Sequence, residues 1–255
     1  MSRENAIARA EAIFDDGTFF DLLTRWVSHP TESQNEGCRD ALGNYLVGAI
    51  TPYLENMGFT CRVVDNPVNS RLPFLIGQRM EGEDLPTVLT YGHGDTVLAM
   101  DGRWREGLEP WQVIQEGDRW YGRGAADNKG QHAINLAALA CALEERQQLG
   151  FNTKVLIEMG EEMGSPGLHK ICALEKEALA ADVLIASDGP RIDPRKPTLF
   201  GGSRALFNFD LRLDLRDGGH HSGNWGGLLA NPGIILANAI ASMADARGRI
   251  LVAGL

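Results

Sequence analysis

The sequence lacks the features that mark membrane proteins and proteins of oxidising compartments. No apolar run approaches the roughly 20 residues that a membrane-spanning helix needs, and the N-terminus has no uninterrupted apolar core of a secretory signal. None of the four cysteines is in Cys-x-x-Cys spacing: Cys38, Cys61, Cys141 and Cys172. This argues against a thiolate zinc site or a disulfide framework and favours free thiols. We therefore expect a cytoplasmic protein that does not enter a membrane.

Positive charge is also scarce. The 24 Lys and Arg residues are outnumbered by 34 Asp and Glu residues, which gives a net charge of −10 and a pI near 5.1. The basic residues are scattered, and a nucleic-acid backbone requires a basic patch. The glycine-rich segment YGRGAADNKG, residues 121–130, matches neither the dinucleotide fingerprint nor the Gly-Lys-Ser/Thr phosphate loop. We expect no nucleic-acid partner and no bound nucleotide.

The sequence does contain a repeated order of apolar strand, acidic turn and helix. With 255 residues, 44% of them hydrophobic, the chain can bury a sizeable core. Strands are predicted at 59–64, 74–78, 87–91, 153–159 and 182–186, and helices at 5–26 with a break at Gly17, at 38–57 and from 130 to 150. This order predicts an α/β fold, with a mostly parallel sheet and helices on both faces. In such sheets ligands bind at the carboxyl ends of the strands.

The character of the sequence changes after residue 196. Residues 206–215 alternate between apolar and polar side chains, as in an amphipathic strand of an antiparallel sheet. A helix is predicted at 232–244, and residues 250–255 read as the start of another strand. We therefore predict two domains, residues 1–196 and 197–255, of which the second is the beginning of an α+β domain.

The segment TYGHGDTV, residues 90–97, is the centre of the candidate site. It ends an apolar run, and glycines flank His93, so we expect a buried strand that leads into a tight turn. An imidazole binds zinc through one ring nitrogen, and a carboxylate such as Asp95 near the other nitrogen fixes its orientation and raises its basicity. The alternative is a capped turn with a hydrogen-bonded histidine, and the acidic turns downstream favour the metal.

Three later turns carry carboxylates: Asp127, the pair Glu161 and Glu162, and Asp188. One histidine with several carboxylates suits a divalent cation such as zinc, manganese or cobalt. Of two adjacent glutamates, one can bind metal while its uncoordinated neighbour takes a proton from water. The structural alternatives are an acidic helix start for the glutamates and an ordinary turn residue for Asp188.

Five motifs together resemble one family of enzymes. GHGDTV, YGRGAADNKG, EMGEEMGSPGL, ASDGP and HSGNWGG occur in the order found in the di-zinc metallopeptidases. This family contains carnosinases and other cytosolic dipeptidases, aminoacylase, acetylornithine deacetylase and succinyl-diaminopimelate desuccinylase. The HSGNWGG segment favours the dipeptidase branch. The resemblance implies a catalytic domain in residues 1–196 and part of a lid and dimerisation domain in residues 197–255.

The resemblance also implies a role for each candidate in a two-zinc site. His93 and Asp188 would hold one zinc, Glu162 would hold part of the other, and Asp127 would bridge both. Asp95 would orient His93, and Glu161 would be the general base. The peptide bond between Asp127 and Asn128 would be cis.

The second domain is implied to contribute to catalysis across a dimer. His221 matches a lid histidine that reaches the substrate's scissile carbonyl in a partner subunit, and His220 is a weaker candidate. His29, His132 and His169 have no motif support, and we predict that they are ordinary surface or core residues. The implied partners are a second copy of the chain and a small peptide or N-acyl amino acid substrate.

The chain departs from the family pattern in one respect. Family members return to the catalytic domain after the lid and supply a last zinc-binding histidine, whereas no histidine follows His221 here. We therefore expect this chain, by itself, to hold at most one zinc tightly and to have little activity. Two alternatives to a dipeptidase stay open, an N-acyl amino acid deacylase or desuccinylase and a truncated fragment without catalysis.

Overall fold

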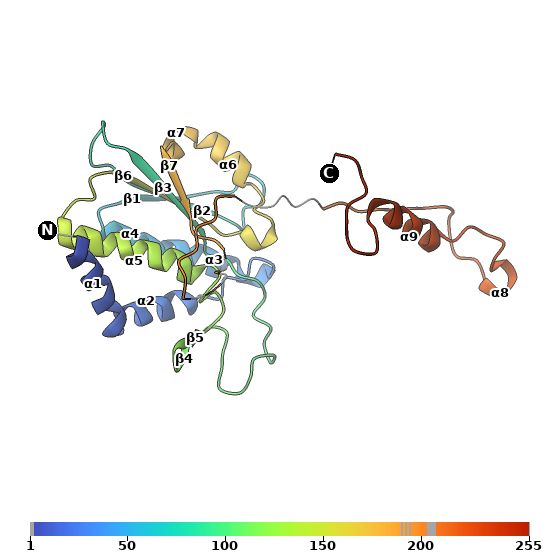
Figure 1. The fold of residues 1–255 in the computed structure, drawn as a ribbon, viewed down its shortest axis with the longest axis horizontal. Coiled ribbons are helices and arrows are strands. Elements are labelled where there is room, and N and C mark those ends of the chain that lie inside the picture. Colours follow the sequence, from blue (N-terminus) through green and yellow to red (C-terminus); the bar gives the residue numbers. More distant parts are fainter. Residues whose placement is uncertain (1–2, 190, 192, 194, 203–207, 255) are drawn as a thin grey trace. The chain divides into compact units, whose positions relative to one another are not determined.

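The computed structural model describes residues 3–189, 191, 193, 195–202 and 208–254. Its contacts divide the chain into two units, Met1–Pro190 and Arg191–Leu255 (Figure 1), and the division falls a few residues before the one predicted after residue 196. In the described part of the chain, no helix is long and apolar enough to cross a membrane.

A five-stranded sheet forms the centre of the first unit. In spatial order its strands are β1 (Thr60–Val64), β2 (Phe74–Arg79), β6 (Asn152–Glu158), β3 (Thr87–His93) and β7 (Val183–Ala186). β6, β3 and β7 are parallel neighbours, and β2 is antiparallel to both β1 and β6. Four of the five strands therefore run in one direction, so the predicted mostly parallel α/β sheet is confirmed.

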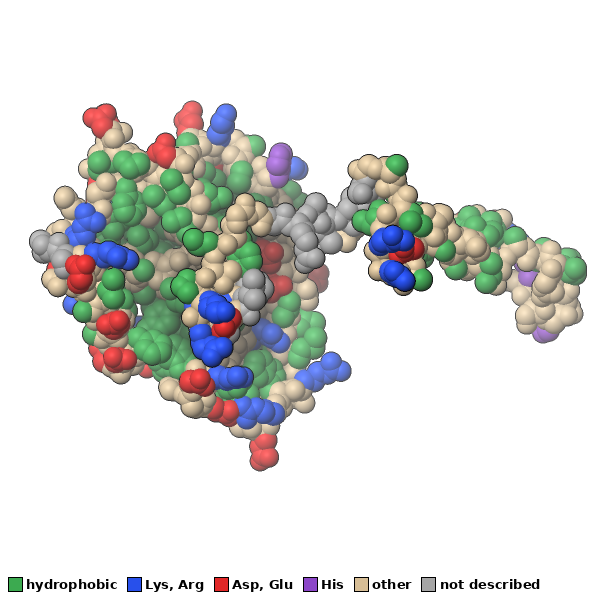
Figure 2. Space-filling view, viewed as in Figure 1, with side chains coloured by type: hydrophobic (Ala, Val, Ile, Leu, Met, Phe, Trp, Pro, Cys, Tyr) green, Lys and Arg blue, Asp and Glu red, His purple; other side chains and the backbone are tan. Residues whose placement is uncertain are grey.

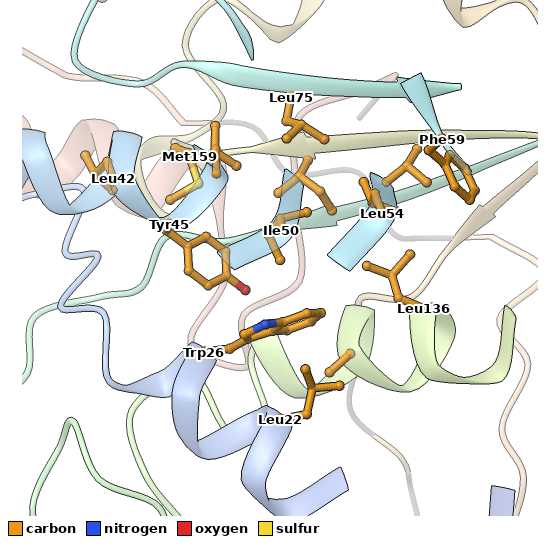
Figure 3. Close-up of a cluster of buried hydrophobic side chains, with 14 of the residues drawn as sticks. Leu22, Trp26, Leu42, Tyr45, Ile50, Leu54, Phe59, Leu75, Leu136 and Met159 are labelled. Carbon is orange, nitrogen blue, oxygen red and sulfur yellow. The ribbon is translucent and has the colours of Figure 1, made fainter. Parts of the chain in front are cut away.

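Side-chain alternation along the strands builds an apolar layer on each face of this sheet. Leu75 and Val155 face a cluster that includes Leu136 of helix α5 (Lys129–Arg146), shown in Figure 3. Phe74 and Leu156 face the other way, onto helices α6 (Leu168–Leu174) and α7 (Lys176–Leu179). Helices therefore cover both faces, as predicted (Figure 1). β7 is the exception, because all four of its residues are exposed.

Four further α-helices lie on the α5 side of the sheet: α1 (Arg3–Asp15), α2 (Thr18–Val27), α3 (Arg39–Asn44) and α4 (Thr51–Asn56). A π-helical segment η2 (Tyr45–Ile50) joins α3 to α4, and a single-turn helix η1 (Glu36–Cys38) precedes α3. The predicted break at Gly17 separates α1 from α2, and Gly17 has a φ of 87° that suits glycine. η2 places Tyr45, Leu46 and Ile50 in the core.

Residues 114–121, for which no strand was predicted, form a short hairpin. β4 (Ile114–Glu116) pairs with β5 (Arg119–Tyr121) in antiparallel register. Trp120 stacks on Phe14 of α1 at 5.3 Å between ring centroids and meets Phe20 of α2 edge-on at 5.0 Å. These contacts with distant helices stabilise a hairpin that is too short to be recognised from its own sequence.

In the described residues of the second unit the predicted helix is present, and neither of the two predicted strands is formed. Helix α9 (Pro232–Met243) begins where the Asn231 side chain accepts hydrogen bonds from the first turn, and a short helix α8 (Ser222–Trp225) precedes it. Residues 208–215 contain no strand, and residues 203–207 lie outside the described residues. The predicted strand at 250–255 is only an isolated bridge between Ile250 and Ala244. A strand needs a pairing partner, and the described residues of this unit form no ladder.

Candidate metal centre

The candidate site lies where three parallel strands end. His93 is the last residue of β3 and pairs in register with Glu158, the last residue of β6. Glu161 begins the short helix η3 (Glu161–Met163) directly after β6, and Asp188 follows β7. Because β3 lies between β6 and β7, the candidate groups of all three strands meet at His93.

His93 is completely buried, and carboxylates surround its ring. Its Nε2 lies 3.1 Å from Asp127 Oδ1 and 3.7 Å from both Glu161 Oε2 and Asp188 Oδ2. The Asp127 side chain is 64% exposed, whereas those of Glu161 and Asp188 are 39% and 30% exposed. The imidazole therefore forms the floor of a site whose carboxylates are open to solvent.

Asp95 holds the opposite side of the ring and also the glutamate turn. Its Oδ1 lies 3.2 Å from His93 Nδ1, and its side chain is fully buried. The same carboxylate accepts hydrogen bonds from the backbone N–H groups of Glu161 and Glu162, both at 3.2 Å. A single buried carboxylate thus orients the imidazole and fixes the position at which η3 begins.

The charges of the site perturb the pKa values of its members. Burial lowers the pKa of His93, but hydrogen bonds to Asp127 and Asp95 outweigh burial and raise it to about 11. The bond to His93 lowers the pKa of Asp127. Burial raises the pKa of Glu161, Glu162 and Asp188. The carboxylates therefore favour a positive charge at His93 Nε2, whether it is a proton or a metal ion.

The donor set fits a divalent cation. One ligand atom each from His93, Glu161 and Asp188 lie within 4.8 Å of one another. Asp127 contacts the same ring nitrogen, His93 Nε2, and is therefore next to this group. Asp95 contacts the other ring nitrogen, Nδ1, and orients the imidazole as carboxylates do for metal-bound histidines. One borderline nitrogen and several hard oxygens suit zinc, manganese or cobalt.

Comparison with known proteins agrees with this chemistry. Residues 89–209 match the peptidase family M20/M25/M40. The chain is 33% identical over 208 residues to a cysteinylglycine-S-conjugate dipeptidase of Corynebacterium striatum, an alignment that covers 81% of this chain and 45% of that protein. It is also 33% identical over 186 residues to the β-Ala-His dipeptidase of Mus musculus, covering 72% of this chain and 37% of that protein.

The chain belongs to the M20/M25/M40 peptidase family. The crystal structure of human carnosine dipeptidase 1 superposes on it with a TM-score of 0.71 and 25% identity, covering 98% of this chain and 54% of that chain. The family resemblance of the five motifs is therefore confirmed. This chain spans about half the length of these relatives or less, as the covered shares show.

The residues that follow Asp127 in the YGRGAADNKG segment form buried contacts that the sequence alone did not reveal. The Asp127–Asn128 peptide bond is cis, as predicted from the resemblance. Lys129 is fully buried, donates a hydrogen bond to the carbonyl oxygen of His29 at 2.7 Å and lies over the Tyr45 ring at 4.8 Å. Burial lowers the pKa of Lys129 to about 7, although the charge of Asp95 opposes this shift.

His132 is also part of the buried structure beneath the site. It is 2% exposed, stacks on Trp26 and hydrogen-bonds Tyr45. Burial lowers the pKa of His132 to about 3, so the imidazole is neutral. Its prediction as a core or surface histidine is confirmed, since it is a core residue, and it also contacts Asn128 of the motif. The sequence contained a signal for this contact, because His132 follows Asn128 by four residues and therefore lies one helical turn away on the same face.

The remaining candidates, His220 and His221, lie in the second unit. His221 is exposed, and its Nδ1 accepts a hydrogen bond from the Gly223 N–H at 3.1 Å, which caps α8. The His220 ring lies 5.8 Å from that of Trp225. Within their own unit these contacts are local, and the predicted role of His221 at a substrate stays a prediction.

Proposed function

We propose that the chain is the metal-binding part of a dipeptidase that hydrolyses the amide bond of a small peptide. The observation that carries this proposal is the convergence of His93, Glu161 and Asp188 at the ends of adjacent strands, with Asp127, just before α5, beside His93. The two relatives compared above are named as dipeptidases, which supports a dipeptide substrate.

Each residue of the site has a distinct role in this proposal. His93, Asp127, Glu162 and Asp188 would hold one or two divalent ions, with zinc as the first candidate and Asp127 between the two positions. A bound ion would polarise the amide carbonyl and lower the pKa of a water molecule. Asp95 contacts both the imidazole and the backbone of the glutamate turn, so these two parts of the site are held together before an ion binds.

Glu161 is the proposed general base. Burial raises its pKa, which moves a carboxylate toward the range in which proton transfer near neutral pH is efficient. Its side chain is 39% exposed and therefore accessible to both water and substrate. It would take a proton from the attacking water and pass it to the leaving amine.

The proposal extends to the assembly and the location of the protein. We propose a homodimer in the cytoplasm, in which His221 of one subunit approaches the substrate held by its partner. Figure 2 shows acidic and basic side chains interspersed over the visible face of the first unit, which agrees with a small substrate better than with a nucleic-acid backbone.

Substitution of the bridging aspartate tests the proposed function. In Asp127→Ala we expect zinc content after dialysis, measured by elemental analysis, to fall to background, and slow hydrolysis of a neutral dipeptide to disappear. The control is Asp118→Ala, which removes an exposed aspartate from the β4–β5 turn and should retain zinc. Full zinc retention by Asp127→Ala would show that the metal is bound elsewhere.

A further inference from the structure

A chain of buried hydrogen bonds lies beneath the candidate metal centre. The Tyr45 hydroxyl is 2.6 Å from His132 Nε2, and His132 Nδ1 is 3.2 Å from Asn128 Oδ1. Tyr45 and Asn128 are 0% exposed and His132 is 2% exposed, so water does not compete for these contacts. Figure 3 shows Tyr45 next to Trp26 in the main apolar cluster, which holds its ring in place.

Backbone groups determine the direction of every bond in this chain. Asn128 Oδ1 faces the N–H of His93 and Asn128 Nδ2 faces the carbonyl oxygen of Ser187, which settles the orientation of the amide. Because Asn128 Oδ1 can only accept, His132 Nδ1 must carry the proton. His132 Nε2 is then the acceptor, and the Tyr45 hydroxyl donates to it.

The Asn128 amide connects the two strand ends that carry candidate ligands. It accepts from His93 N–H at 3.3 Å, at the end of β3, and donates to Ser187 O at 2.7 Å, one residue before Asp188. Asn135, farther along α5, donates to Ser187 Oγ at 2.7 Å and strengthens the same connection. The position of this amide therefore bears directly on the distance between His93 and Asp188.

The packing leaves little room for the amide to move. A Cβ atom on Gly92 would lie 2.9 Å from His132 Cβ and 3.0 Å from Asn128 Oδ1. The backbone of β3 thus presses against both side chains at the residue before His93. A displaced His132 or Asn128 would shift β3 itself.

We propose that Tyr45 and His132 are positioning residues that fix the Asn128 amide and, through it, the spacing of His93 and Asp188 on which metal affinity depends. This inference rests on the proposed function, since it concerns the affinity of the proposed metal site. The two residues do not touch the metal or the substrate. Removal of such outer partners typically weakens metal affinity by about 10- to 100-fold.

Two substitutions of His132 separate positioning from general packing. In His132→Asn the amide nitrogen lies near the former Nδ1 and can still donate to Asn128 Oδ1. In His132→Gln the amide reaches the former Nε2 and the contact with Tyr45, but no donor faces Asn128. Tyr45→Phe removes the hydroxyl alone. Tyr53→Phe is the control, because Tyr53 packs on the same Trp26 ring at 5.4 Å.

Two quantities are measured for each variant. The first is the affinity for cobalt(II), obtained from the visible absorption of the bound ion during competition with a chelator. The second is the midpoint of thermal unfolding of the metal-free chain. We expect His132→Gln to weaken cobalt binding by roughly 10- to 100-fold. His132→Asn should recover most of this affinity, Tyr45→Phe should weaken binding, and Tyr53→Phe should leave it unchanged. A purely structural role would make affinity follow the thermal midpoint and would give no rescue by asparagine.

A second measurement examines the proton directly. The ¹⁵N chemical shifts of the His132 ring in the metal-free chain should show the proton on Nδ1, and a proton on Nε2 would overturn the inference. Equal cobalt affinity in wild type, His132→Gln and Tyr45→Phe would also overturn it and leave the proposed function intact. If the wild-type chain binds no cobalt, the proposed function fails, and the inference about affinity fails with it.

Discussion

Glu161 and Glu162 are adjacent, and among the described residues Glu161 is the one that groups with His93 and Asp188. Both backbone N–H groups are held by Asp95, which aims the two side chains from one fixed turn. Glu161 Oε2 lies 3.7 Å from His93 Nε2, close enough to serve as a ligand as well as a base. The proposed division, with Glu161 as base and Glu162 as ligand, therefore requires a direct comparison.

The comparison is between Glu161→Gln and Glu162→Gln. We expect Glu161→Gln to keep zinc and lose hydrolysis, because a base need not coordinate the metal. Glu162→Gln should bind zinc more weakly, because an amide is a poorer ligand than a carboxylate. Zinc content and dipeptide hydrolysis are measured on both. Zinc loss in Glu161→Gln with retention in Glu162→Gln would reverse the assignment.

Gly94, the residue after His93, shows how closely the core approaches the site. A Cβ atom there would lie 2.5 Å from Tyr45 Cε1 and 2.8 Å from Met159 Sδ. We expect Gly94→Ala to lower the free energy of unfolding by about 1–3 kcal/mol, the usual cost of overpacking a core.

Gly43→Ala is the matched control for this prediction. A Cβ atom at Gly43, inside α3, meets nothing within 4 Å. Alanine is favoured over glycine in a helix by roughly 0.5–1 kcal/mol, so this variant should be slightly more stable. Urea unfolding measures both, and equal stability of the two variants would contradict the close approach at Gly94.

At the scale of elements, one carboxylate joins the loops at the far end of the sheet. Glu81, just after β2, accepts hydrogen bonds from the N–H groups of Leu149 and Gly150 at 2.8–2.9 Å and from Arg79 Nε at 3.1 Å. Burial opposes the shift, but these bonds prevail and lower the pKa of Glu81. Because its folded pKa is depressed, Glu81 stabilises the fold above its unfolded pKa of about 4.3 and loses this contribution as pH falls through the folded pKa.

The expected result is a pH-dependent cost of Glu81→Gln. At pH 7 the substitution should lower the free energy of unfolding by about 1 kcal/mol, since it replaces an ionised acceptor. The difference from wild type should shrink below about pH 4. Urea titrations at both pH values measure it, with Glu83→Gln, an exposed residue of the same loop, as the control. If the difference in free energy of unfolding between Glu81→Gln and wild type were the same at both pH values, the ionised carboxylate of Glu81 would not be the stabilising form.

The strands of the five-stranded sheet were predictable because each carries its own apolar pattern. The run that ends at His93 and the run at 153–159 are bounded by glycine and acidic turns, so their ends and candidate ligands could be read directly. The β4–β5 hairpin was missed because its stability comes from Trp120 packing on distant helices. The contact between His132 and Tyr45 depends on how α5 packs against η2, and local patterning contains no such information.

At the scale of the whole molecule, the six candidate residues of the proposed metal site all belong to the first unit: His93, Asp95, Asp127, Glu161, Glu162 and Asp188. The candidate histidines His220 and His221 belong to the second unit. The second unit exposes many apolar side chains, Ile234 of α9 at 62% and Leu228 at 77% among them (Figure 2). Metal binding and any contribution of a lid can thus be changed separately by substitution.

The burial of Lys129 has a consequence for chemical labelling. With a pKa of about 7, its amine is largely uncharged at pH 8 and intrinsically nucleophilic, yet no part of it is exposed. Acylating reagents can reach it only when the core opens around Tyr45 and the His29 carbonyl. Lys170 and Lys176 are exposed and lack this protection.

The acylation rate of Lys129 should therefore report the rate at which the core of the first unit opens. In a timed pulse of reagent followed by peptide mass spectrometry, Lys170 and Lys176 should be modified at once. Lys129 should be modified far more slowly, and at a rate that rises as urea is added. Prompt modification in native buffer would mean that the protein exposes this amine without unfolding, and that its interior opens on a much shorter timescale than its packing implies.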